Sequence, residues 1–231
     1  MGHSIALLPL NSGASIPQFG FGTYKLTDQD AYDGVRDALE LGYRHIDTAQ
    51  MYGNEAEVGR ALADAPIARK EIFVTSKLNN PNHEPDVARE SLQRSLEDLQ
   101  LDYLDLFLIH WPLPMFYGGD IMPTWRAMES FVDEGLVRSI GVSNFEAHHL
   151  APILEQGRIA PAVNQIESHP YFANRELHRF NAEHGIITEA WAPLARGTVL
   201  GEPSIVEIAR EVGARESQVV LRWALQRGDV V

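Results

Sequence analysis

Short apolar runs alternate along this chain with stretches in which apolar residues recur every three or four positions. The runs are typical of buried strands, and the longer stretches are typical of helices with one apolar face. Strands are predicted over residues 19–23, 45–47, 72–77, 104–109, 137–143, 162–167 and 186–191. Helices are predicted between residues 27 and 42 and over residues 55–63, 85–99, 122–134, 147–156, 175–184, 204–212 and 217–227. Strand–helix pairs in this succession favour an α/β fold of the (β/α)₈ TIM-barrel type over an open sheet.

The two ends of the chain add to this pattern. Apolar residues over 5–8 and 14–17 flank an Asn-Ser-Gly turn at 11–13, which predicts an N-terminal β-hairpin. Residues 229–231 have the character of the start of an eighth strand, and a closed barrel needs that strand and its helix. We therefore expect a barrel whose C-terminal part is truncated or missing, with an exposed edge. No linker or change of composition divides residues 1–231, so we expect a single domain.

Composition and charge narrow the class of protein. The chain has 231 residues, a net charge of −13 and no cysteine. The acidic balance argues against nucleic acid or an anionic membrane as a partner, and no apolar run approaches the ~20 residues of a membrane span. Residues 1–4 lack a basic segment followed by an apolar one, so we expect no signal peptide. We expect a cytoplasmic monomer, since the absence of cysteine fits a reducing compartment.

The strongest functional signal lies where the predicted strands end. Polar or aromatic residues close them, namely Thr23, Asp47, Lys77, His110, Asn144, Gln165 and Trp191. A parallel barrel brings all these ends to one rim, where such barrels carry their chemistry. Tyr52 can give a proton to a carbonyl oxygen, and a nearby Lys77 would lower its ordinary pKa of about 10. Asp47 would orient Lys77, and a neutral His110 would hydrogen-bond the substrate oxygen. The set indicates a carbonyl reductase.

Each of these residues also has a purely structural interpretation. An aspartate at a strand end is most often a cap, and a loop tyrosine usually packs on the surface. His110 can equally be a core histidine with satisfied hydrogen bonds. Lys77 is harder to explain, because a lysine that closes an apolar strand is costly to bury without a partner. The functional interpretation is favoured by their joint occurrence at successive strand ends.

Longer motifs connect the chain to a known family. They lie at residues 42–49, 52–55, 104–112, 140–145 and 163–167. These segments resemble the signature sequences of the aldo-keto reductase family, and the resemblance covers essentially the whole chain. The run Glu-Ala-Trp-Ala-Pro-Leu at 189–194 is similar to that of bacterial 2,5-diketo-D-gluconate reductases.

The resemblance implies an NADPH-dependent reductase of aldehydes or ketones, with keto-sugars among the substrate types and NADH as an open alternative cofactor. Tyr52 would be the general acid, with Asp47, Lys77 and His110 in the roles given above. The implied cofactor contacts are Gly22, Thr23, Tyr24, Asp47, Ser143, Asn144, Gln165, Trp191, Pro193, Leu194, Ala195 and Arg196. Among these, Ser143, Asn144 and Gln165 would hydrogen-bond the nicotinamide carboxamide. Trp191 would stack on the nicotinamide ring, and backbone groups of residues 194–196 would cradle the pyrophosphate. The implied substrate contacts are Tyr24, Tyr52, Asn79, His110 and Trp111, with Phe116 beside them.

Several alternatives stay open at this point. Trp191 can be an interior barrel aromatic, Ser143 and Asn144 a helix cap, and Gln165 part of a buried network. The family's clamp for the cofactor's 2′-phosphate normally follows strand eight, and this sequence stops before it. Some relatives of the family are non-catalytic, so a nucleotide-binding or regulatory barrel is the second hypothesis for this chain.

Two other classes are disfavoured. Gly20 and Gly22 lack the third glycine of a dinucleotide fingerprint, which argues against a Rossmann site. The nine histidines show no metal-binding spacing with a carboxylate at strand ends, so we predict no metal and disfavour a metal-dependent hydrolase.

Overall fold

A computed structural model describes residues 5–231 of the chain, so the start, where we expect no signal peptide, lies outside the described residues. Seven parallel strands form one curved sheet in the order of the sequence, β3 to β9. Their bounds are β3 (Phe21–Gly22), β4 (His45–Asp47), β5 (Phe73–Leu78), β6 (Leu104–Ile109), β7 (Val137–Ser143), β8 (Val163–Glu167) and β9 (Ile187–Trp191). This order, with a helix after most strands, confirms the predicted TIM-type α/β barrel.

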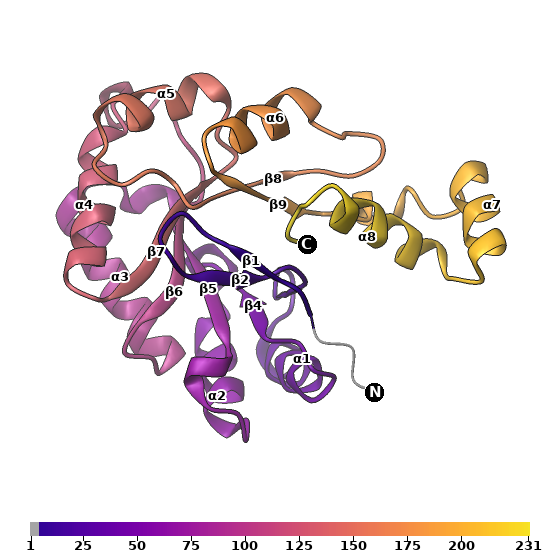
Figure 1. The fold of residues 1–231 in the computed structure, drawn as a ribbon. Helices are drawn as coiled ribbons and strands as arrows, with labels where there is room; N and C mark the ends of the chain where they lie inside the picture. The colour runs from indigo at the N-terminus through magenta and orange to yellow at the C-terminus, as the bar shows by residue number, and fades with distance from the viewer. Residues whose placement is uncertain (1–4) are drawn as a thin grey trace.

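The helices surround the sheet, and the last two extend beyond β9 (Figure 1). They are α1 (Asp28–Glu40), α2 (Glu55–Asp64), α3 (Pro85–Leu99), α4 (Met122–Asp133), α5 (Ala147–Gln156), α6 (Arg175–Glu183), α7 (Pro203–Val212) and α8 (Glu216–Gln226). Short 3₁₀ turns occupy the loops, as η1 (Gln50–Tyr52), η2 (Arg69–Glu71), η3 (Asn80–Asn82), η4 (Tyr117–Gly119) and η5 (Ala195–Gly197). The predicted helices agree with these bounds to within one residue at most ends.

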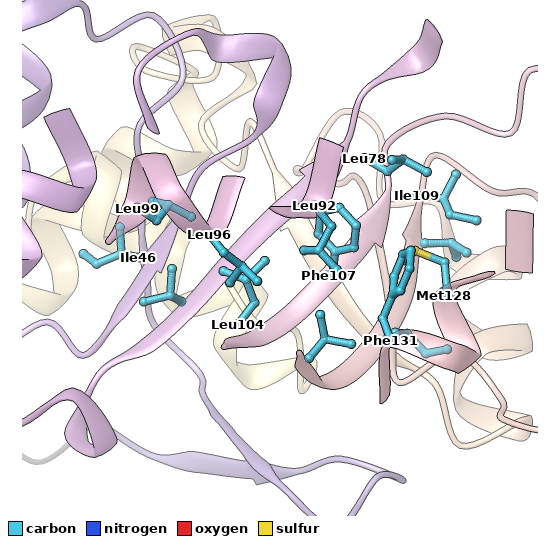
Figure 2. Packing of buried hydrophobic residues seen from close by; sticks show 14 of the residues in the cluster. Ile46, Leu78, Leu92, Leu96, Leu99, Leu104, Phe107, Ile109, Met128 and Phe131 are labelled. Atoms are coloured by element: carbon cyan, nitrogen blue, oxygen red, sulfur yellow. The ribbon is translucent and has the colours of Figure 1, made fainter. Parts of the chain in front are cut away.

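The main apolar core lies between the sheet and its helices (Figure 2). Leu92, Leu96 and Leu99 follow one another at helical spacing on α3 and share a buried cluster with Phe107 of β6 and Phe131 of α4. Burial of each such side chain stabilises the fold by about 1.5–3 kcal/mol. Every residue of β6 is buried, which agrees with its near-continuous apolar sequence and with a strand covered on both faces.

The N-terminal hairpin closes one end of the barrel. β1 (Leu7–Pro9) and β2 (Ser15–Pro17) pair antiparallel, which confirms the hairpin predicted around the turn at residues 11–13. Ile16 is fully buried, and it packs in a second apolar cluster with residues of β5, β6 and β8. The hairpin therefore seals the barrel at the end opposite the strand carboxyl ends.

The last residues of the chain lie between the two edges of the sheet. Val230 forms a parallel bridge with Glu189, and the Ala190 amide donates to the Val230 carbonyl at 2.8 Å. On the other side, the Gly20 amide donates to the Val231 carbonyl at 2.7 Å. These bonds confirm the start of an eighth strand at 229–231. Beyond them β3 has no partner on that side in the part of the chain described, as predicted for an exposed edge.

The first barrel strand is shorter than predicted. The sequence favoured a strand over 19–23, whereas only Phe21 and Gly22 belong to β3. The reason is that only Phe21 and Gly22 pair with the short strand β4, whereas the Gly20 amide bonds Val231 on the other side and Thr23 donates a single further bond to the Asp47 carbonyl at 2.9 Å.

None of the helices within residues 5–231 combines the length and the apolar character needed to cross a bilayer. The same residues contain no group of three or more His, Cys, Asp or Glu side chains placed to hold a metal ion.

Candidate active site

Four side chains from successive barrel units meet at one rim. The Lys77 ammonium donates to Asp47 Oδ1 at 2.6 Å, to the Thr48 carbonyl at 2.9 Å and to the Tyr52 hydroxyl at 3.3 Å. The rings of Tyr52 and His110 lie edge to face, with centroids 5.9 Å apart. Lys77 is completely buried, so these partners replace the water that an ammonium normally needs. The structure thus brings Asp47, Tyr52, Lys77 and His110 together.

The turn after β4 puts Tyr52 above Lys77. The 3₁₀ turn η1 ends at Gly53, whose left-handed φ of +67° reverses the chain where a residue with a Cβ would be strained. The Asn54 amide then donates to the carbonyls of Thr23 and Leu26, each at 2.9 Å. The loop that carries Tyr52 is therefore tied to the neighbouring first strand.

The charge of Lys77 is maintained by its partners. Burial disfavours the ammonium, but attraction to Asp47 and Tyr52 outweighs it and raises the pKa of Lys77 above its ordinary value. The second oxygen of Asp47 accepts a hydrogen bond from the Gln165 side chain at 2.8 Å. Asp47 is therefore held on both oxygens, and Lys77 is a fixed positive charge beside the tyrosine.

Tyr52 differs from the expectation drawn from the sequence. We expected Lys77 to bring the pKa of Tyr52 down. Burial raises the pKa of Tyr52, Lys77 lowers it and Asp47 raises it, so that the pKa lies above its ordinary value. Lys77 acts in the expected direction, but desolvation is the larger effect. Tyr52 is therefore a protonated phenol at neutral pH.

His110 is a neutral imidazole. Burial, with a smaller effect of Lys77 in the same direction, lowers the pKa of His110 to about 4. Its Nδ1 atom is buried and has no hydrogen-bond partner among the described residues. A neutral ring at the cavity wall can hydrogen-bond an oxygen without adding charge.

A cavity of about 810 Å³ opens over these residues. Tyr24, Tyr52, His110 and Trp111, four of the residues predicted to contact substrate, line it, and the contacts themselves stay predictions. Asn79 does not belong to its lining, because its Oδ1 accepts from the Asn80 amide at 2.8 Å and so caps η3. The substrate contact of Asn79 stays a prediction. Phe116 also lies outside the lining and is 62% exposed.

One side of the cavity carries a connected set of polar groups. Ser143 Oγ donates to the backbone carbonyl of Gln165 at 2.9 Å. The side-chain amide of Asn144 donates to the backbone carbonyl of His110 at 3.0 Å. The Trp191 indole donates to Asn144 Oδ1 at 2.9 Å. All four side chains from 143, 144, 165 and 191 line the cavity, so they form one wall of amides and an aromatic ring.

The loop after β9 has an unusual backbone. Ala192, Ala195 and Arg196 have left-handed φ values of 48°, 47° and 54°. Such a conformation costs about 1–3 kcal/mol for a residue other than glycine and is concentrated at functional sites. Pro193, Leu194 and Arg196 line the cavity, whereas Ala195 is buried beneath them. Gly22 also lines the cavity, and the next residue, Thr23, is buried.

The sequence did not indicate three further polar residues of the lining, namely Lys25, His45 and Glu189. His45 and Glu189 both reach the cavity from inside the barrel. Each lies within a motif that we noted, yet neither closes a strand. The sequence did contain a clue for His45. Alternate residues of a strand point to the same face, and His45 is two residues before Asp47.

Comparison with known proteins adds an independent line of evidence. The profile of the Aldo/keto reductase family matches residues 18–231. An aldo-keto reductase of Mycolicibacterium smegmatis is 45% identical over 224 residues, which cover 97% of this chain and 81% of that protein. Methylglyoxal reductase DkgA of Salmonella typhimurium is 44% identical over 227 residues, with the same shares of 97% and 81%.

Solved structures agree with the sequence matches. The crystal structure of an aldo/keto reductase from Brucella melitensis superposes with a TM-score of 0.94 at 42% identity, covering 99% of this chain and 87% of that one. This confirms both the barrel and the resemblance on which the site residues were assigned. The chain therefore belongs to the aldo/keto reductase family of oxidoreductases.

Proposed function

We propose that this protein reduces small aldehydes or ketones to alcohols with NADPH, and that Tyr52 is the general acid. The observation that carries the proposal is the set of contacts around Lys77, which joins Asp47 and Tyr52 beside a neutral His110 on a cavity of about 810 Å³. One chain supplies all four side chains, so we also propose that residues 1–231 act as a single domain and as a monomer.

The residues around the cavity fit a nicotinamide cofactor. Ser143, Asn144 and Gln165 offer amide and hydroxyl groups for the carboxamide, and Trp191 offers a flat face for the ring. The left-handed loop after β9 suits a pyrophosphate, because backbone amides that converge in such turns bind anions. When bound, the cofactor supplies the hydride. NADH is the second cofactor to test, since these contacts are shared by both forms.

The proton transfer follows from the protein's own groups. A carbonyl carbon that accepts hydride leaves a negative charge on its oxygen, and the Tyr52 hydroxyl donates its proton to that oxygen. The Lys77 ammonium at 3.3 Å then stabilises the phenolate that Tyr52 becomes. Asp47 keeps Lys77 in place, and His110 can hold the carbonyl oxygen in line. Each role uses a group in the charge state that its surroundings favour.

The aromatic wall favours small substrates. Tyr24, Tyr52 and Trp111 line the mouth of the cavity, and apolar walls with few polar groups are typical of pockets for small molecules. Two-carbonyl compounds such as methylglyoxal are suitable first probes, because a relative at 44% identity is named a methylglyoxal reductase. Keto-sugars are the second class to test.

A variant of Tyr52 tests the proposal directly. We expect Tyr52→Phe to lower kcat/KM for methylglyoxal about 10²–10⁴-fold, the usual contribution of general acid catalysis, while NADPH binding persists. Oxidation of NADPH gives the rate, and quenching of tryptophan fluorescence gives binding. Tyr32→Phe is the matched control, because its hydroxyl bonds Asp64 on the outer surface.

Two results would contradict the proposal. Equal turnover by the wild type and Tyr52→Phe would remove Tyr52 as the acid. A wild-type protein that binds NADPH and reduces no carbonyl compound would favour the second hypothesis, a nucleotide-binding barrel.

A further inference from the structure

The barrel interior just below the Asp47–Lys77 ion pair is polar. His45 precedes Asp47 by two residues on β4, and Thr75 precedes Lys77 by two on β5, so both point into the barrel one layer below that pair. Glu189 of β9 completes this layer from the other side. Bulky branched apolar residues normally fill barrel layers, so a histidine, a threonine and a glutamate in this place require a reason.

The contacts of Glu189 leave its carboxyl group incompletely partnered. Oε1 lies 3.8 Å from His45 Nε2, and that nitrogen is already 3.0 Å from Thr75 Oγ1. Oε2 is buried and has no hydrogen-bond partner among residues 5–231. Glu189 is only 4% exposed, so a carboxylate here would be a poorly compensated buried charge.

No neighbouring group neutralises a charge on Glu189. The titratable groups that face it are His45, Asp47 and Tyr52 from the region of β4 and Lys77 from β5. Burial lowers the pKa of His45 to about 4, so His45 is neutral, and Lys77 is engaged by Asp47. Gln165 of β8 is uncharged, as is Val230, which pairs with Glu189 on its other side.

The pKa of Glu189 agrees with this geometry. Burial, and next to it the charge of Asp47, raises the pKa of Glu189 to about 8, although Lys77 and Gln165 act in the opposite direction. The ion pair above it is balanced while Glu189 keeps its proton. Loss of that proton leaves the buried site with one net negative charge.

We propose that Glu189 is a positioning residue whose proton keeps the site competent: the enzyme reduces carbonyl compounds with Glu189 neutral and slows when Glu189 ionises. The proposal rests on the proposed role of Tyr52 as the acid. Negative charge on Glu189 raises the pKa of Tyr52 and so makes it a weaker acid. It also opposes the negative charge that develops on the substrate oxygen.

The protonation of Glu189 is measured without turnover. We would label the glutamate side-chain carboxyl carbons with ¹³C and follow their NMR signals from pH 5 to pH 10. One signal should titrate near pH 8 and be missing in Glu189→Gln. Glu55→Gln should retain it, because Glu55 is another buried glutamate whose carboxylate accepts hydrogen bonds from Ser76 and Ser95.

The effect on the reaction is measured as a pH profile. Wild-type kcat/KM for methylglyoxal should fall about tenfold between pH 7 and pH 9, as expected for a change of about one pKa unit at the acid. Glu189→Gln, which imitates the neutral side chain, should equal the wild type at pH 6–7 and stay level to pH 9. Glu167→Gln is the matched control, because Glu167 lies at the end of the neighbouring strand β8 and outside the cavity lining.

Specific results would overturn this inference. The inference is wrong if the Glu189 signal of the wild-type protein titrates together with those of the ordinary glutamates. This result does not depend on whether the Glu189→Gln variant folds. Parallel pH profiles for the wild type and Glu189→Gln would also overturn the inference. Absence of any carbonyl reduction by the wild type would instead count against the proposed function, and the NMR titration would still decide the state of Glu189.

Discussion

Strand β5 carries two pairs of buried residues that point to opposite faces and differ in their chemistry. Val74 and Leu78 face the helices and belong to the main apolar cluster. Thr75 and Lys77 face the barrel interior, where Lys77 is 0% exposed. Burial alone therefore does not decide whether a position in this barrel carries an apolar or a charged side chain.

The difference lies in the partners that each face provides. Val74 and Leu78 on the outer face are stabilised by packing, which has no preferred direction and tolerates any close-fitting apolar group. Lys77 depends on three directed contacts, to Asp47, Thr48 and Tyr52, from a single neighbouring segment of chain. Substitutions on the first face should change stability, and substitutions on the second should change chemistry.

The apolar face gives the largest expected effect on stability. Phe107→Ala should lower the free energy of unfolding by about 3–5 kcal/mol, because the removed ring leaves a cavity in a fully buried site. Urea unfolding measures the change. Phe172→Ala is the control, since Phe172 is 49% exposed and its loss should cost far less. An equal loss in both variants, or a lower kcat/KM per folded molecule of Phe107→Ala, would contradict the separation of the two faces.

A substitution on the interior face should lower turnover. Lys77→Met should lower kcat/KM about 10²–10³-fold, as is typical when one charge-stabilising group is removed, and should flatten the pH profile of reduction. Its free energy of unfolding should fall as well, because the Asp47 carboxylate is left without its cation, so turnover is compared per folded molecule. Lys70→Met, on the exposed turn η2, should leave turnover unchanged. Normal turnover or an unaltered pH profile for Lys77→Met would remove the tuning role.

A smaller effect should appear as a loss of folding stability in acid. Burial lowers the pKa of His45, His83 and His110 to about 4 each, below the ordinary value of 6.5. Between pH 6.5 and pH 4 the unfolded chain therefore binds three protons that the folded protein does not. Glu189 and Glu55, with raised pKa values, act in the opposite sense in this window. The histidines outweigh the two glutamates, so unfolding takes up protons in this window and stability should fall as the pH drops, by ~1.4 kcal/mol per pH unit for each net proton taken up.

A histidine outside the rim isolates this effect. His83→Gln removes one of the three groups without touching the cavity lining. Its free energy of unfolding should decline less steeply than that of the wild type as pH falls from 6.5 to 4, measured by urea unfolding at each pH. If the free energy of unfolding falls equally steeply with pH in both proteins, His83 is protonated in the folded state as readily as in the unfolded chain, and the prediction is wrong.

The rim residues illustrate how far sequence reasoning reached. Asp47, Lys77 and His110 stand at or next to the ends of apolar runs, and Tyr52 follows in a motif, so their meeting was predictable from strand order. The short first strand was not predictable, because its partner Val231 is more than 200 residues away along the chain. The raised pKa of Tyr52 was not predictable either, because the degree of burial depends on the packed structure.

The amino-acid sequence by itself determined the succession of strands and helices, the hairpin, the family and the four residues at the rim. Those conclusions depend on local periodicity and on motifs of neighbouring residues, which are present before the chain folds. Only the tertiary structure decided that Asn79 caps a turn, that Lys77 has three acceptors, and that Glu189 lies beneath Asp47 in the barrel. Such outcomes depend on distances between distant strands and on exclusion of water, and neither exists until the chain has folded.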